Sequence, residues 1–240
     1  MSVPQLPLAL RYPPDQRLDA FVHAPAGAIE QLRALSQGTH AQGAHASRDS
    51  VYVAGPAGVG KTHLLLATCA ATEAAGRRAA YLPLVAAAGR LRDALEALEG
   101  NDLIALDGLD VIAGQREDEV ALFDAHNRAR AAGVVLLYAA RDIPDAIGLG
   151  LPDLRSRLGQ CTRITLGPLD EEGRREVLRQ RAQRRGLMLE DAALDWLLRR
   201  VGRDLGGLTA LLDRLDRASL AAQRRITVPF LRQTLEKGEG

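Results

Sequence analysis

Residues 55–62 read Gly-Pro-Ala-Gly-Val-Gly-Lys-Thr, which matches the phosphate-loop pattern G-x-x-x-x-G-K-[ST]. The apolar run 51–54 before it predicts a strand, and residues 61–75 after it predict a helix. In this setting, backbone amides at the start of the helix favour bound phosphate. We therefore expect the loop to hold ADP or ATP through Gly55, Gly58, Gly60, Lys61 and Thr62. A glycine-rich turn without a ligand is the alternative.

Two further residues fit a nucleotide site with magnesium. Lys61 would reach the terminal phosphates and Thr62 would hold Mg²⁺. Asp107 ends the apolar run 103–106, where the magnesium-side carboxylate of such enzymes stands, although an acidic strand end would look the same. Position 108 is glycine, where many ATPases of this type carry the glutamate that activates water. We expect weak or no intrinsic ATPase activity, with Asp110 acting at most from a distance.

Short apolar runs alternate with amphipathic stretches along the first two thirds of the chain. The runs predict strands at 51–54, 79–82, 103–107, 134–138 and 163–166. The stretches predict helices at 26–37, 61–75, 84–98 and 117–132. This alternation is typical of an α/β fold with a parallel five-stranded sheet and helices on both faces.

After residue 168 every segment reads as helix. Helices are expected from Asp170 to Gly186 and at 191–200, 204–223 and 228–236. Asp170 suits the N-cap of the first of them. The predicted organisation is an extended proline-rich tail at 1–20, an α/β nucleotide-binding domain at 21–167 and a small all-helical domain at 168–240.

Composition excludes several function classes. The 31 basic and 30 acidic residues balance, so no overall charge draws the chain to nucleic acid or anionic lipid. No apolar run approaches the roughly 18 residues needed to cross a membrane, and the start of the chain does not read as a signal peptide. Cys69 and Cys161 read as reduced, buried small hydrophobes. We expect a soluble cytoplasmic protein without membrane partners.

Arginine is placed where it could act on phosphate, but each case has a plain structural alternative. Arg157, in the run 151–158, could act as a finger on a neighbour's nucleotide, or cap a helix, or be solvated. Arg203 could fold back onto the phosphates from the helical domain, and its alternative is equally strong. The arginine-rich stretch 174–185 favours a solvated helix face over a contact to the DNA backbone.

Three segments together resemble the DnaA/Hda family of AAA+ ATPases. They are residues 107–114, 123–128 and 149–158, and residues 215–230 look specifically like the Hda branch. The resemblance covers nearly the whole chain. It implies an AAA+ phosphate-loop domain followed by a small helical lid. The segment 138–144 departs from the family, because it lacks the usual polar residue at the first sensor position.

The N-terminal run Gln5-Leu6-Pro7-Leu8-Ala9-Leu10 resembles the sliding-clamp-binding motif of the Hda branch, with an ordinary tail as the alternative. Gln5, Leu6, Leu8 and Leu10 would enter an apolar groove of the clamp, the beta subunit of DNA polymerase III. The chain stops near the lid, so we expect no DNA-reading C-terminal domain, and DNA contact only through the clamp.

The resemblance implies a negative regulator of replication initiation. Such a protein docks on the DNA-loaded clamp and stimulates the initiator DnaA to hydrolyse its ATP. Arg157 matches the arginine finger that acts across the partner interface, and Arg203 matches the nucleotide-sensing lid arginine. Family members are thought to work with ADP bound, and a homo-oligomer is left open. The alternatives are a true ATPase of the helicase-loader or clamp-loader type, and a DnaA-like DNA binder.

Overall fold

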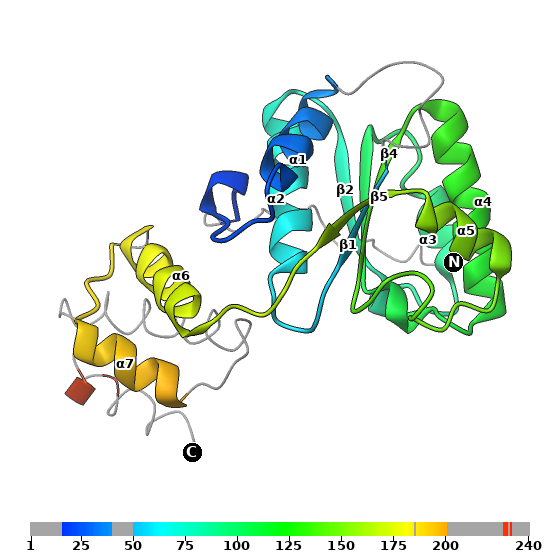
Figure 1. The fold of residues 1–240 in the computed structure, drawn as a ribbon. Coiled ribbons are helices and arrows are strands. Elements are labelled where there is room, and N and C mark those ends of the chain that lie inside the picture. Colours follow the sequence, from blue (N-terminus) through cyan, green and yellow to red (C-terminus); the bar gives the residue numbers. More distant parts are fainter. Residues whose placement is uncertain (1–15, 40–49, 185, 201–227, 230, 232–240) are drawn as a thin grey trace, which may run out of the picture.

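Five parallel strands form the centre of the fold in the computed structural model, which describes residues 16–39, 50–184, 186–200, 228–229 and 231 (Figure 1). The strands are β1 (Val51–Ala54), β2 (Ala79–Pro83), β3 (Leu103–Asp107), β4 (Val135–Ala140) and β5 (Thr162–Thr165). Their order is β2-β3-β4-β1-β5, and every neighbouring pair is parallel. The predicted parallel five-stranded sheet is therefore confirmed. Because β1, β4 and β3 are adjacent and parallel, their carboxyl ends meet at one edge of the sheet.

Helices cover both faces of the sheet, and the strands are apolar on both sides for that reason. Helices α1 (Ala28–Gln37) and α2 (Lys61–Ala74) pack on the face that carries Val51 and Val53. Helices α3 (Leu91–Glu96), α4 (Arg116–Ala132) and α5 (Pro152–Gly159) pack on the face that carries Tyr52 and Ala54. The described residues also form three single turns of 3-10 helix: η1 (Leu18–Ala20), η3 (Leu84–Ala86) and η4 (Leu109–Val111).

The predicted helix at 84–98 is wrong as one continuous element. It divides into η3 and α3, with Gly89 between them at φ +77°, a conformation that side-chain-bearing residues rarely adopt. The Asp118 carboxylate from α4 accepts hydrogen bonds from the backbone N–H groups of Gly89 at 2.8 Å and Leu91 at 3.3 Å. These two amides are thereby diverted from helical carbonyls, so a contact distant in sequence ends the helix.

The other predicted element boundaries lie closer to those of the structure. The fourth strand runs to Ala140 rather than ending at residue 138, and the fifth begins at Thr162 rather than 163. Helix α5 was not predicted as an element. It follows a proline-containing loop and is only eight residues long, so its periodicity is weak, yet Leu154 and Leu158 are fully buried.

The described part of the helical region contains α6 (Glu171–Arg184) and α7 (Asp191–Arg200), which pack through a small core of their own. The predicted N-cap is present, since Asp170 Oδ1 accepts the Gly173 N–H at 2.7 Å. The predicted helix at 204–223, and most of that at 228–236, lie outside the described residues. Among the residues that are described, no helix is both long and apolar enough to cross a membrane.

Candidate functional site

The glycines of the 55–62 loop are required by close contacts. A Cβ at Gly60, which has φ +100°, would lie 2.8 Å from Cε2 of Phe21. A Cβ at Gly55 would overlap the carbonyl oxygen of Leu166, just beyond β5. The loop thus passes tightly between Phe21, in the segment before α1, and the end of β5.

Lys61 opens α2 and turns its side chain back across the loop. Its Nζ donates hydrogen bonds to the carbonyl oxygens of Gly55 at 2.5 Å and Pro56 at 2.7 Å. Burial lowers the pKa of Lys61, an effect opposed by the nearby negative charges of Asp107 and Asp110. The ammonium is therefore held inside the loop, at the place where phosphates would be gathered.

Thr62 and Asp107 are brought together, as the phosphate-loop reading requires. The Thr62 hydroxyl donates to Asp107 Oδ2 at 2.6 Å across the end of β4. The Tyr81 hydroxyl on β2 donates to the same oxygen at 2.8 Å. Burial and the Asp107 charge raise the pKa of Tyr81, so its hydroxyl remains a donor. Tyr81 was missed by the sequence reasoning, since nothing in a lone strand tyrosine reveals which neighbouring strand it will face.

The position that usually carries the water-activating glutamate is Gly108, at φ +83°. The nearest acidic candidate, Asp110, is already engaged. Both of its carboxylate oxygens accept the backbone N–H of Arg141 at 3.0 Å, which ties η4 to the end of β4. The site therefore assembles groups of the kinds that can hold phosphate and metal, and Asp107 and Asp110 both accept hydrogen bonds within the chain.

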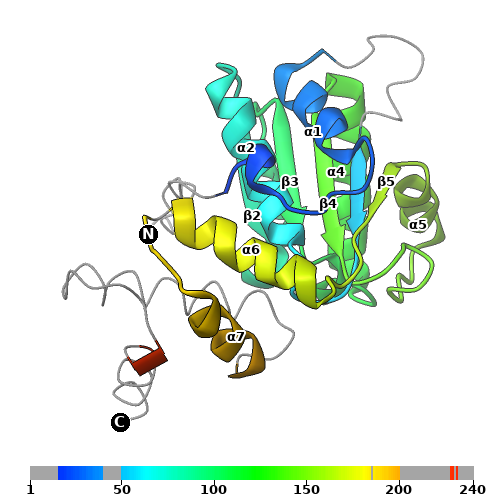
Figure 2. The ribbon, with the colours of Figure 1, turned by 60° about the vertical axis from the view of Figure 1, so that its left-hand side comes forward.

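His63 connects the loop helix to the lid and to the segment before α1. Its Nε2 lies 3.2 Å from the Arg17 carbonyl oxygen, and its Nδ1 lies 3.4 Å from Arg181 Nη2 on α6. Its ring also packs on Phe21. Figure 2 shows α6 lying close to α2 and to the segment before α1. A crevice of about 30 Å³ opens beside this junction, lined by Phe21, Val22, His23, Pro25, Val59, Leu166, Gly167 and Leu169.

Two arginines of α6 form ion pairs with acidic side chains of the chain. Arg175 pairs with Asp195 of α7, and Arg179 contacts Glu176 at 3.2 Å and Asp191 at 3.3 Å. These contacts favour the solvated helix face over a DNA-binding surface, because a guanidinium in an ion pair must give up that partner to reach a phosphate.

Arg157 lies on α5, which Figures 1 and 2 both place at an edge of the α/β domain away from α6 and α7. Its side chain is half-buried, and its guanidinium has no hydrogen bond or ion pair with any residue that the structure describes. By contrast Arg155, two residues earlier, lies 3.7 Å from Asp145. Arg157 is therefore not held by α6 or α7, the described helices of the lid.

A buried histidine lies behind Arg157. His126 of α4 is 5% exposed, and its Nδ1 lies 2.8 Å from the hydroxyl of the fully buried Tyr138 on β4. Burial, with smaller contributions from the positive charges of Arg157 and Arg130, lowers the pKa of His126 to about 4. The imidazole is thus neutral at physiological pH and adds no positive charge near Arg157.

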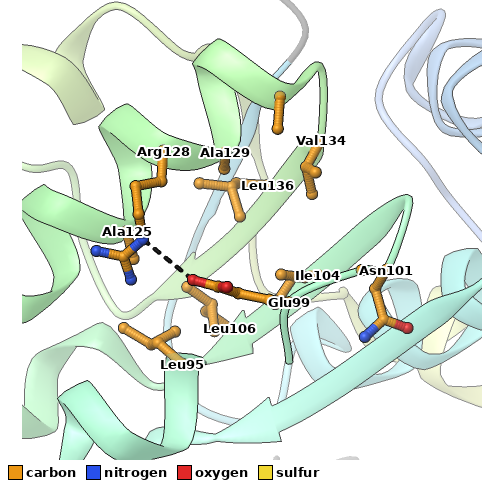
Figure 3. A pocket seen from close by; sticks show the side chains of 12 residues that line it. Leu95, Glu99, Asn101, Ile104, Leu106, Ala125, Arg128, Ala129, Val134 and Leu136 are labelled. Carbon is orange, nitrogen blue, oxygen red and sulfur yellow. Dashed lines mark ion pairs between the residues drawn. The ribbon is translucent and has the colours of Figure 1, made fainter. Parts of the chain in front are cut away.

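A larger, apolar cavity of about 330 Å³ lies elsewhere, between α3, α4 and the sheet (Figure 3). It opens near the amino ends of β3 and β4, beside Asn101 and Val134, and Arg128 reaches Glu99 at 3.3 Å at its rim. None of the predicted site residues lines it. Ligands of parallel sheets bind at the carboxyl ends of the strands, so the loop edge and not this cavity is the candidate site.

Two groups of predicted residues fall outside the described part of the chain. They are Arg203 and the N-terminal residues Gln5, Leu6, Leu8 and Leu10. In the described part, the structure gathers residues 55–62 with Asp107 and sets Arg157 apart on a different element. That separation into two sites is a geometric fact that the linear order of the motifs does not reveal.

Residues 170–235 match the family model described as Hda, lid domain. The fold as a whole matches domain III of the replication initiator DnaA from Thermotoga maritima, with 19% identity, TM-score 0.74, and 94% of this chain and 98% of that chain covered. Residues 170–235 therefore form an Hda-type lid, and the chain as a whole has the AAA+ fold of DnaA domain III. The family resemblance predicted from residues 107–158 and 215–230 is thereby confirmed.

The chain is also similar in fold to other AAA+ structures. AMPPCP-bound DnaA from Aquifex aeolicus matches with 18% identity and TM-score 0.68, over 95% of this chain and 71% of that chain. The Holliday junction branch migration motor RuvB from Thermotoga maritima matches with 20% identity and TM-score 0.63, over 94% and 72%. At such identities these structures show the AAA+ fold alone. The lid match is what distinguishes the DnaA/Hda family within it.

His126 should make the free energy of unfolding depend on pH. Its folded pKa of about 4 is below its unfolded value near 6.5. Its stabilising contribution is thus complete above pH ~6.5 and is lost as the pH falls toward 4, by up to about 1.4 kcal/mol per pH unit. Denaturant unfolding at several pH values should show that the free energy of unfolding of His126→Gln falls less steeply toward low pH than that of the wild type. His23→Gln, which alters an exposed histidine, should keep the wild-type slope; identical slopes in all three proteins would contradict this account.

Proposed function

We propose that the chain is a negative regulator of replication initiation, which binds a nucleotide and stimulates ATP hydrolysis by the initiator DnaA through Arg157. The observation that carries the proposal is the placement of Arg157 on a helix at the domain edge, away from its own lid and without an acidic partner in the described residues. The Hda lid match supports the choice of this branch over the initiators themselves.

The loop edge fits a nucleoside diphosphate or triphosphate with Mg²⁺. The loop of residues 55–62 would hold the phosphates, with Lys61 exchanging its two carbonyl partners for phosphate oxygens. Thr62 and Asp107 offer a hydroxyl and a carboxylate to Mg²⁺, which would neutralise phosphate charge. No cluster of three or more His, Cys, Asp or Glu in the described residues could hold a metal unaided, so the metal would arrive with the nucleotide.

The base would lie toward the crevice beside Phe21, His23 and Leu169, where the pre-α1 segment, the loop and the lid linker meet. Its volume of about 30 Å³ is too small for a purine, so the segment 21–25 would have to shift on binding. Arg203 is assigned to nucleotide sensing from the lid on the family resemblance. These assignments make the bound nucleotide an element that links the lid to the α/β domain.

Lys61→Ala should weaken ADP binding about ten- to a hundredfold, because a charge-assisted hydrogen bond contributes about 1.5–3 kcal/mol. Isothermal titration with ADP and Mg²⁺ measures the change in Kd. Arg33→Ala, which removes an exposed cation of α1 away from the loop, is the matched control and should bind like the wild type. Equal affinity of Lys61→Ala and the control would remove the loop from nucleotide binding.

Arg157 would act on a nucleotide held by a neighbouring subunit. A guanidinium placed beside a transferring phosphoryl group stabilises the charge that develops on that phosphoryl group. The subunit that carries the arginine needs no hydrolytic machinery of its own. This suits a chain with Gly108 in place of the usual glutamate and with Asp110 bound to the Arg141 amide. The same two features count against the alternative of a helicase loader or clamp loader that hydrolyses its own ATP.

Arg157→Ala should reduce DnaA ATP hydrolysis in the presence of clamp-loaded DNA to near the unstimulated rate, a loss of about a hundredfold or more in stimulation. Release of phosphate from radiolabelled ATP bound to DnaA is the measurement. Arg155→Ala is the matched control, because it removes an exposed arginine of the same helix, which pairs with Asp145. Stimulation that survives Arg157→Ala unchanged would overturn the proposed mechanism.

The N-terminal run that contains Gln5, Leu6, Leu8 and Leu10 is proposed to bind the DNA-loaded sliding clamp, which would bring the chain to the newly replicated DNA. The proposal rests on the resemblance of that run to the clamp-binding motif. Prolines 4 and 7 restrict the unbound peptide, which lowers the entropy lost when it enters a groove. Contact with DNA would then be indirect.

The double variant Leu8→Ala/Leu10→Ala should abolish retention on immobilised sliding clamp while leaving ADP affinity unchanged, because two apolar anchors are lost from the peptide and none from the loop. Leu231→Ala, which truncates a buried leucine of the lid core, tests whether general destabilisation reduces retention. Full retention of the double variant would remove the clamp from the proposal.

A further inference from the structure

A buried carboxylate on α4 anchors the loop that leads into α5. Glu119 is 1% exposed, yet its two oxygens accept hydrogen bonds from three backbone N–H groups. Oε1 accepts from Gly114 at 2.7 Å and from Gly150 at 2.9 Å, and Oε2 accepts from Leu151 at 2.6 Å. No arginine or lysine in the described residues pairs with it. The backbone amides alone compensate the burial of this carboxylate.

Two of these amides belong to the start of the Arg157 helix. Leu151 is the residue immediately before α5, and Pro152 follows it as the first helical residue. Amides at the start of a helix have no partner within it, so a carboxylate from elsewhere both satisfies them and opposes the positive end of the helix dipole. Glu119 thus holds the N-cap residue Leu151 by its backbone amide, as the carboxylate of a capping box does, but from another helix.

The remaining freedom of α5 is removed by its apolar face. Leu154 and Leu158 are 0% and 1% exposed and pack in the same core as Leu122 of α4. The two leucines fix the rotation of α5 about its axis, while the bonds to Glu119 fix where the axis begins. Arg157 adjoins Leu158, so both constraints determine where its guanidinium is presented. Helix α5 packs against α4, the helix that carries Glu119.

We propose that Glu119 is a positioning residue for Arg157: it holds the beginning of α5 so that the guanidinium meets a neighbour's nucleotide in reactive alignment. The inference rests on the proposed function of Arg157. Catalytic groups must be held to within about 0.5 Å of their productive position, and an arginine near the end of a short helix depends on how that helix is anchored. Glu119 itself touches neither nucleotide nor partner.

The residue before it supplies a matched control. Asp118 is 3% exposed and also accepts two backbone amides, but these belong to Gly89 and Leu91, at the start of α3. Asp118→Asn and Glu119→Gln therefore remove the same charge at comparable depth from adjacent positions. A general structural role predicts equal effects of the two substitutions, whereas positioning of Arg157 predicts an effect of Glu119→Gln alone.

The test measures stimulated ATP hydrolysis by DnaA on clamp-loaded DNA with the full chain and each variant. Glu119→Gln should lower the maximal stimulated rate about tenfold or more while the concentration for half-maximal stimulation stays within about twofold, because docking is kept and alignment is lost. Asp118→Asn should retain the wild-type maximal rate. Combined with Arg157→Ala, Glu119→Gln should cause no additional loss, since both act through one guanidinium.

Amide hydrogen exchange gives a readout that does not depend on activity. Gly150 and Leu151 should exchange faster in Glu119→Gln than in Asp118→Asn, at a temperature where both are folded. If Glu119→Gln does not fold, Glu119→Asp, which retains the charge but withdraws it by one methylene, takes its place. Three outcomes would overturn the inference. The Glu119 variant could stimulate DnaA as well as the wild type, or Asp118→Asn could lose the same share of the maximal rate. The third is a change in the concentration for half-maximal stimulation alone.

The failure of the proposed function has a different signature. In that case Arg157→Ala would stimulate as well as the wild type, whatever the Glu119 variants do. If Arg157→Ala loses stimulation while Glu119→Gln keeps it, the function stands and the positioning role falls.

Discussion

Strand β4 is hydrogen-bonded to β1 on one side and to β3 on the other, and the remaining chemistry of the loop edge follows from this pairing. It sets the phosphate loop and Asp107 on either side of one strand end, close enough for the Thr62 hydroxyl to reach the carboxylate. It also brings the amide of Arg141 to Asp110. The pairing of the strands therefore places the start of α2, the Lys61 ammonium and the two carboxylates beside one another.

On the other face of the sheet, the first turn of α4 has a comparable organising role. Its neighbouring carboxylates reach in two directions, Asp118 to the start of α3 and Glu119 to the start of α5. Buried carboxylates are tolerated only where hydrogen bonds replace lost water, so such contacts allow little movement. The phosphate loop and the Arg157 helix are thus fixed by separate sets of interactions, on opposite faces of the sheet.

Much of the architecture was predictable because local signals were strong. Residues 55–62, the strand 103–107 and the N-cap Asp170 are each encoded within a few residues. Three features could not be predicted, because each depends on a partner at least 26 residues away: the break at Gly89, the Tyr81 contact with Asp107 and the anchoring of α5. Strand order likewise arises from the packing of the whole sheet. The family resemblance, rather than periodicity, was what directed attention to Arg157.

His63 stands two residues after Lys61, and its ring joins the Arg17 carbonyl to Arg181 of α6. Arg184 of the same helix reaches the carbonyl of Asp19 at 3.3 Å. A displacement of the first turn of α2 would therefore act through the His63 ring both on α6 and on the segment before α1, so these three parts of the chain cannot move independently.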